Sequence, residues 1–288
     1  MNSPRDLRRR IKSISGTAQI TKAMQMVAAS KMRKSQQAAL DARPFAQMLY
    51  RIQRSAVRNV IGFSHPLLER REVRKRAIIL IAADKGLCGA LNTNVFRLAS
   101  QFDTATTVFI TAGRRAAQFI ARSGRQLSAE FAYGDSPTFA EARAIARLAR
   151  DLYASKEVDQ VQMIATRFVN TLTQEPLTLD VLPIGTIKSV NVPGAEPEAD
   201  RPVEGEDTIF EPSTGAVLSY FLERYLNIYV YYTLLNAKAS EQSARMVAMK
   251  NATDAAETLI KDLTLEYNKL RQGRITQELL EIAGGQAE

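Results

Sequence analysis

Residues 240–282, SEQSARMVAMKNATDAAETLIKDLTLEYNKLRQGRITQELLEI, decide the fold because their pattern predicts one long helix. The chain has no proline after Pro212 and no glycine between Gly215 and Gly273. The spacing predicts a helix from about residue 213 to residue 283, ~105 Å long at 1.5 Å per residue, with glycines following it. Apolar side chains recur every three or four residues, close to the heptad seam of paired helices: Met249, Ala252, Ala256, Leu259, Leu263, Tyr267 and Leu270.

A helix of this length needs a neighbour, because an isolated helix is marginally stable in water. The N-terminal region offers one, a predicted helix from about Pro4 to about Arg58 with a kink at Arg43–Pro44. Its apolar stripe has the spacing of a narrow buried seam. The stripe comprises Leu7, Ile11, Ile14, Ala18, Ile20 or Thr21, Met24, and Val27 or Ala28.

Charge is distributed unevenly along the chain. Residues 1–60 contain 13 Lys or Arg against two Asp, whereas residues 240–288 contain six basic and eight acidic side chains. Opposite net charges favour pairing of the two helices. An antiparallel coiled coil of the N- and C-terminal helices is the simplest arrangement, since the middle of the chain lies between them.

The middle of the chain alternates strand and helix signals. Four apolar runs predict buried strands at 77–83, 107–111, 161–165 and 177–184. Helical patterns separate the first three, at 90–101, 114–123 and 138–153. This alternation indicates a Rossmann-like α/β domain with a largely parallel sheet, inserted into a long helical hairpin. The expected division is 1–60 long helix, 61–76 basic linker, 77–185 α/β domain, 186–212 linker rich in Pro, Gly and acids, and 213–288 long helix.

A search for catalytic chemistry finds no motif. The stretch DKGLCGALN (84–92) follows a strand, but it lacks both the P-loop and the dinucleotide fingerprint, so a tight turn is the simpler interpretation. The chain has one cysteine, Cys88, and one histidine, His65, which excludes an intramolecular disulfide and a Cys/His metal cluster. We interpret Cys88 as a small structural residue and His65 as a solvated one. Glu278 and Glu281 share a helix face without a pocket, so we expect no catalytic, cofactor or metal site.

The stretch ITKAMQMVAASKMRKSQ (20–36) contains four Lys or Arg and no acid. Three interpretations remain open: an ordinary solvated helix surface, a nucleic-acid-binding coiled-coil module, or contact with an acidic protein surface through adaptable methionines. The basic residues are not interleaved with stacking aromatics, which disfavours nucleic acid. A nucleotide-binding enzyme or an oxidoreductase is a more distant alternative. No apolar run reaches the ~20 residues needed to cross a bilayer, and the Arg-rich start is interpreted as mature structure.

Three segments, 20–36, 80–96 (LIAADKGLCGALNTNVF) and 240–282, closely resemble the gamma subunit of F-type ATP synthase, bacterial type. The resemblance implies the central rotor stalk, which couples proton flow through the membrane c-ring to conformational cycling of the catalytic beta subunits. It implies no catalytic site in this chain. The implied partners are the alpha and beta subunits of the F1 hexamer, the epsilon subunit and the c-ring, without nucleic acid. The implied location is peripheral, on the cytoplasmic face of the bacterial inner membrane.

The same resemblance implies which residues meet the stator. Physically, an apolar residue such as Met24 lets contacts form and break, whereas a buried charge pair is costly to separate. The linker at 192–207 follows no family pattern, and no paired-cysteine insert suggests thiol regulation. The implied rotor–stator residues are Lys22, Met24, Lys31, Arg33, Lys34, Arg245, Gln272, Thr276 and Glu278, and the implied terminal bearing is Leu279, Leu280 and Ile282.

Overall fold

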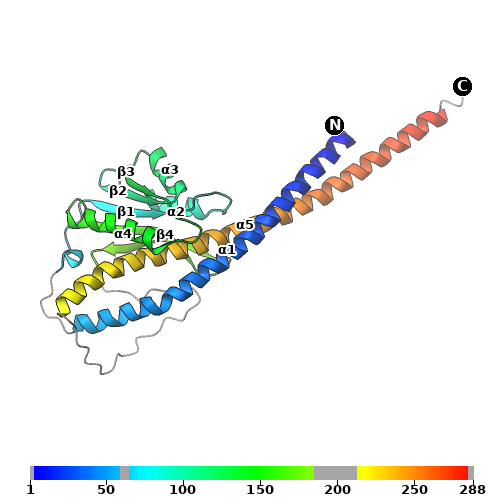
Figure 1. Ribbon diagram of the computed structural model, residues 1–288. Helices are drawn as coiled ribbons and strands as arrows, with labels where there is room; N and C mark the ends of the chain where they lie inside the picture. Colours follow the sequence, from blue (N-terminus) through cyan, green and yellow to red (C-terminus); the bar gives the residue numbers. More distant parts are fainter. Residues whose placement is uncertain (1–2, 59–64, 185–212, 285–288) are drawn as a thin grey trace. The chain divides into compact units, whose positions relative to one another are not determined.

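The structure, a computed structural model, describes residues 3–58, 65–184 and 213–284 (Figure 1). They divide into two compact units, each described separately below. The terminal unit comprises Met1–Ala28 and Arg245–Glu288, and the sheet unit comprises Ala29–Ala244. The elements in chain order are α1 (Pro4–Arg58), η1 (Pro66–Leu68), β1 (Arg76–Ile81), α2 (Leu91–Ala99), β2 (Thr107–Ala112), α3 (Arg114–Arg122), β3 (Gln126–Phe131), α4 (Phe139–Ala154), β4 (Gln160–Phe168), β5 (Gln174–Leu182) and α5 (Thr214–Gly284).

Both predicted long helices are present. α1 has 55 residues and passes through Pro44 without ending there. α5 has 71 residues and ends at Gly284, where the glycine pair was expected to stop it. The absence of proline and the scarcity of glycine after residue 212 account for this uninterrupted length. The predicted linker at 192–207 lies outside the described residues.

In the terminal unit, α1 and α5 run in opposite directions. Arg8 donates a hydrogen bond to the Tyr267 hydroxyl, and further along α1 Thr21 meets Thr253, which comes earlier in α5. The sequence left two positions of the α1 stripe open, Ile20 or Thr21 and Val27 or Ala28. Thr21 and Ala28 are buried, whereas Ile20 and Val27 are exposed.

The seam predicted on α5 is partly wrong. Leu259 and Leu270 are 43% and 39% exposed, whereas Ile260 is half-buried and Thr253 is buried. The less exposed positions step four and three residues, a period that keeps one side of a helix toward its neighbour. The prediction placed Leu259 at a step where the period selects Ile260, and it omitted Thr253, which follows the half-buried Ala252. The positions with this period are 249, 253, 256, 260, 263 and 267, and the half-buried Ala252 lies beside Thr253.

The sheet unit contains a five-stranded sheet in the order β3-β2-β1-β4-β5. β1 pairs in parallel with β2 and β4, β2 pairs in parallel with β3, and β5 is antiparallel to β4. The four predicted strands are therefore present in a largely parallel sheet, and the three predicted helices are α2, α3 and α4. β3 was not predicted because it is an edge strand with mostly exposed side chains, so it lacks the apolar run that marks a buried strand.

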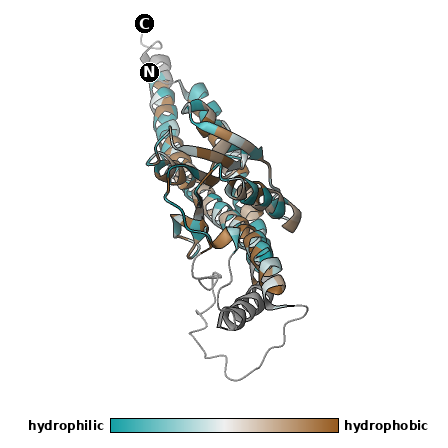
Figure 2. Cartoon of the chain, turned by 90° about the vertical axis from the view of Figure 1, so that its left-hand side faces the viewer, coloured by the Kyte–Doolittle hydropathy of each residue, from teal (hydrophilic) through white to brown (hydrophobic). Residues whose placement is uncertain are grey.

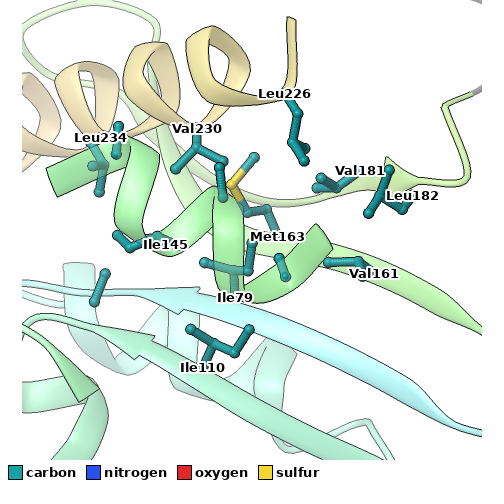
Figure 3. Close-up of a cluster of buried hydrophobic side chains, with 14 of the residues drawn as sticks. Ile79, Ile110, Ile145, Val161, Met163, Val181, Leu182, Leu226, Val230 and Leu234 are labelled. Carbon is teal, nitrogen blue, oxygen red and sulfur yellow. The ribbon is translucent and has the colours of Figure 1, made fainter. Parts of the chain in front are cut away.

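Helices cover both faces of the sheet. α4 and α5 pack on one face, where Ile145, Val230 and Leu234 lie over Ile79 and Met163 (Figure 3). α2 and α3 cover the other face, where Val95 and Ile120 meet Ile78 and Leu80. Figure 2 shows the apolar colouring concentrated on the strands and interrupted by polar turns along the helices. Part of α5 therefore belongs to the core of the sheet unit, beside α4.

Candidate functional site: the faces of the long helices

The basic face of α1 begins in the terminal unit. Lys22 is exposed, and Met24 is half-buried. Met26 is 62% exposed, so it points to a different side of α1. Met24 thus has a partly covered side chain beside an exposed lysine, an arrangement in which an apolar surface can make weak contacts with a partner.

Three predicted residues of α1, Lys31, Arg33 and Lys34, belong to the sheet unit. Arg33 and Lys34 are exposed. Lys31 is bound within the chain, because its Nζ lies 2.5 Å from Oδ2 of Asp135, in the loop after β3. The hydrogen bond from Lys31 lowers the pKa of Asp135, partial burial opposes that shift, and the charge of Lys238 adds to it. The lowered pKa keeps the Asp135 carboxyl ionised at neutral pH.

The predicted residues of α5 lie in the terminal unit. Arg245 is 8% exposed, so its side chain is largely enclosed in this chain. Gln272 and Thr276 are exposed, and the Thr276 hydroxyl donates a 3.0 Å hydrogen bond to the Gln272 carbonyl. This bond stays within α5 and does not use the side-chain amide of Gln272.

The terminal bearing residues differ in how far the structure describes them. Leu279 and Leu280 are 61% and 67% exposed, two large apolar side chains that have solvent around them. Glu278 and Ile282 lie in α5, but their side chains are outside the described ones. These two leucines are adjacent in α5 and accessible to solvent.

Sequence reasoning missed a buried charged pair in the sheet unit. Nζ of Lys238 lies 3.0 Å from Oε2 of Glu241 and 3.6 Å from Oδ1 of Asp135. The Lys238 and Glu241 side chains are 2% and 4% exposed. Their spacing of three residues on a helix was the available signal, but only tertiary contacts show that the pair is buried.

The turn between β1 and α2 is tight, as predicted. Leu87 and Gly89 have positive φ angles of 62° and 58°. The Asn92 side chain accepts a 3.1 Å hydrogen bond from the Ala83 N–H, which holds the turn against the start of α2. Cys88 is 2% exposed, confirming its structural role.

The interpretation of His65 as a solvated residue is wrong. His65 is half-buried, and its Nδ1 accepts a 3.2 Å hydrogen bond from the Leu67 N–H at the start of η1. Desolvation lowers the pKa of His65, while the charge of Glu223 opposes that shift. The prediction failed because His65 lies within the predicted linker 61–76, where no periodic pattern indicates burial.

Within the described ranges, no cluster of three or more His, Cys, Asp or Glu side chains could hold a metal ion. Over the same part of the chain, no helix combines the length and the apolar character that a membrane span requires.

Comparison with known proteins identifies the family. A family model described as ATP synthase matches residues 3–287. The gamma chain of the ATP synthase of Opitutus terrae is 46% identical over 99% of this chain and 98% of its own length. The chain belongs to the ATP synthase gamma-chain family. The gamma chain of Desulforamulus reducens is 42% identical over 100% of this chain and 99% of its own length.

Solved structures agree with this membership. A chain of the central stalk and c-ring structure of Tetrahymena thermophila mitochondrial ATP synthase is 25% identical, with a TM-score of 0.60 over 81% of this chain and 99% of its own. A chain from the mitochondrial ATP synthase of Euglena gracilis has a TM-score of 0.68 at 18% identity, over 99% of this chain and 93% of its own. The latter likeness concerns the fold, a mixed α/β sheet combined with a long C-terminal helix. The family expected from the three sequence segments is therefore confirmed.

Proposed function

We propose that this chain is the central rotor stalk of an F-type ATP synthase. It couples proton flow through the membrane c-ring to conformational cycling of the catalytic beta subunits, during ATP synthesis or hydrolysis. The observation that carries the proposal is the pairing of α1 with α5 in opposite directions, through Arg8–Tyr267 and Thr21–Thr253. A stalk must resist twisting, and two helices packed along their length resist it better than one.

The finer architecture belongs to this proposal. We take the helix pair to be an antiparallel coiled coil, because its less exposed positions step four and three residues. The sheet unit is then a Rossmann-like insertion, and the domain division at 60, 76, 185 and 212 stands as proposed from the sequence. The chain contributes no catalytic site, and its partners supply the nucleotide chemistry.

The proposed contacts with the stator follow the family resemblance. Lys22, Arg33 and Lys34 are exposed cations suited to an acidic surface on beta, and Met24 provides the weak apolar contact between them. The proposed contacts closer to the C-terminal end of α5 are Gln272, Thr276 and Glu278. The proposed apolar bearing at that end consists of Leu279, Leu280 and Ile282. Arg245 is buried, so its proposed role is to steady the helix pair as much as to meet beta.

The other proposed partners are the epsilon subunit and the c-ring, which bind the sheet unit and the ends of α1 and α5 beside it. The chain would then be peripheral, held at the cytoplasmic face of the bacterial inner membrane through the c-ring. A mean hydropathy of −0.18 and a net charge of +9 are compatible with such a water-exposed position.

Reconstitution tests the proposal. Purified chain is mixed with alpha and beta subunits, and we expect a stable complex whose ATP hydrolysis rotates a bead fixed to the sheet unit. Failure to assemble, or assembly without rotation, contradicts the proposal. The alternative, a basic nucleic-acid-binding module, predicts binding of DNA or RNA that weakens steeply with salt, and the same purified chain can be assayed for it.

A further inference from the structure

The segment 237–243 of α5 is buried on every side. All seven of its residues are buried, five of them polar or charged: Lys238, Ser240, Glu241, Gln242 and Ser243. A helix at a protein surface normally keeps one polar face in water. Here the polar residues themselves are enclosed, so the surrounding elements must satisfy them.

The carboxyl edge of the sheet encloses one side of the segment. The Ser240 hydroxyl donates to the Thr166 carbonyl at 3.3 Å, and the Ser243 hydroxyl donates to the Thr171 carbonyl at 2.7 Å. The next residue, Ala244, packs against the small cluster of Ala83, Cys88 and Leu91 at the turn after β1. The end of the sheet where α/β proteins usually bind small ligands is therefore in contact with a helix of the same chain.

A chain of alternating charges encloses another side. Glu241 pairs with Lys238, which also faces Asp135, and Asp135 in turn pairs with Lys31 of α1. The Lys238 ammonium also lies 4.8 Å from the centre of the Tyr133 ring, within the range of a cation–π interaction. The loop after β3 thus contacts one turn of α5, and α1 pairs with the same loop.

This arrangement resists rotation of α5 about its own axis. A shift by one residue turns a helix by about 100°. Such a turn would carry Lys238 away from Asp135 and Tyr133 and move both serine hydroxyls away from their carbonyl acceptors. If only apolar side chains surrounded this segment, such a turn would cost packing contacts alone. A buried charge that loses its partner is strongly destabilising.

We propose that residues 237–244 of α5 are a rotational key, through which the sheet unit transmits turning force to the helix pair without slipping. Lys238 is its main positioning residue, because it joins a carboxylate of its own helix to a carboxylate of the loop after β3. This inference rests on the rotor function proposed above. The key lies near the limits of the sheet unit, since Lys31 follows Ala28 and Glu241 precedes Arg245 by only a few residues.

The test replaces the buried pair with apolar residues, Lys238→Met together with Glu241→Met, in the full chain assembled with its partner subunits. Replacing both members removes the two charges of this ion pair together, and such exchanges are often neutral for stability. We expect normal assembly and a normal rate of ATP hydrolysis without load, but a lower stall torque on a bead fixed to the sheet unit. The control is Arg74→Met with Glu72→Met, which removes an exposed ion pair of the same unit and should leave the stall torque unchanged.

A covalent rescue separates slipping from simple misfolding. Cysteines introduced by Ser243→Cys and Thr171→Cys, joined by a short cross-linker, should restore the stall torque of the double-methionine variant, because they fix α5 to the sheet edge. If the double variant does not fold, Asp135→Asn replaces it, since Asp135 is half-exposed, with a smaller loss of torque expected. Unchanged stall torque in a variant that assembles and rotates overturns the key, whereas absence of rotation with the unaltered chain overturns the rotor function itself.

Discussion

The Oγ1 atoms of Thr21 and Thr253 lie 2.6 Å apart, across the two helices of the terminal unit. The Thr21 hydroxyl also approaches the Ala18 carbonyl, and the Thr253 hydroxyl approaches the Met249 carbonyl. Two hydroxyl hydrogens cannot fully satisfy three such contacts, so the pair shares its hydrogen bonds between the helices. A buried polar pair in a helix seam can define the register of the two helices. This matters here because no short loop connects α1 to α5.

We predict that Thr21 and Thr253 are energetically coupled. Thr21→Val or Thr253→Val alone should lower the free energy of unfolding by about 1 kcal/mol, because the remaining hydroxyl is buried with fewer partners. The double variant should lose less than the sum of the single effects. Denaturant unfolding of the three variants and the unaltered chain forms the double-mutant cycle, and additive losses would refute the coupling.

Gly113 is predicted to tolerate no side chain. Its φ is 98°, and a Cβ there would lie 2.0 Å from the Ala82 carbonyl oxygen. Gly113→Ala should therefore destabilise the chain by about 3 kcal/mol or more, seen as a lower thermal unfolding midpoint. Gly124→Ala is the matched control, because Gly124 has a φ of 65° but nothing within 4 Å. It should cost about 1 kcal/mol, and an equal effect of the two changes would contradict the steric argument.

The Asp135 ion pair should make stability depend on pH in the acid range. Its pKa is lowered in the folded state, first by the hydrogen bond from Lys31. A depressed folded pKa adds stability above the unfolded value of about 3.9, and this stability is lost as pH falls through the folded pKa.

Asp135→Asn should accordingly reduce the free energy of unfolding at pH 7 by about 1 kcal/mol or less, because the carboxylate is half-exposed and screened by solvent. The difference between the variant and the unaltered chain should disappear below the folded pKa. Near-ultraviolet circular dichroism of the tyrosines during urea unfolding, at several pH values, measures it. A difference that persists undiminished into strong acid would show that the ion pair is not its source.

Met24→Lys is predicted to impair coupling. A lysine there would add a cation to a half-buried position on the basic face, and a new ion pair with an acidic partner surface would have to break at every step. We expect less ATP formed per proton transported in reconstituted vesicles. Met26→Lys provides the comparison, because Met26 is 62% exposed on another side of α1, and equal losses in both variants would argue against a specific contact at Met24.

Local pattern was sufficient for the long helices and for most of the sheet. α5 follows from the absence of proline and the scarcity of glycine, and α1 from a seam of apolar residues, because both signals concern neighbours within a few residues. β1, β2 and β4 are buried on both faces, so each appears as a continuous apolar run. The edge strand β3 carries no such run and escaped prediction.

For the candidate site too, the sequence indicated the residues but not their tertiary partners. The sequence indicated Lys31 as a cation on a basic helix but could not show its partner Asp135, which is 104 residues away. It likewise contained Lys238 and Glu241 as an ordinary helical pair, of the kind usually found at surfaces.

The sequence alone determined the length of the two helices, the alternation of strands and helices between them, and the family to which the chain belongs. Only the tertiary structure decided which side chains are enclosed: Thr253 as well as Ala252 in the seam, and a charged segment of α5 inside the sheet unit. The physical reason is that helix and strand formation depend on residues close in the chain, whereas burial of a charge depends on elements brought together by folding.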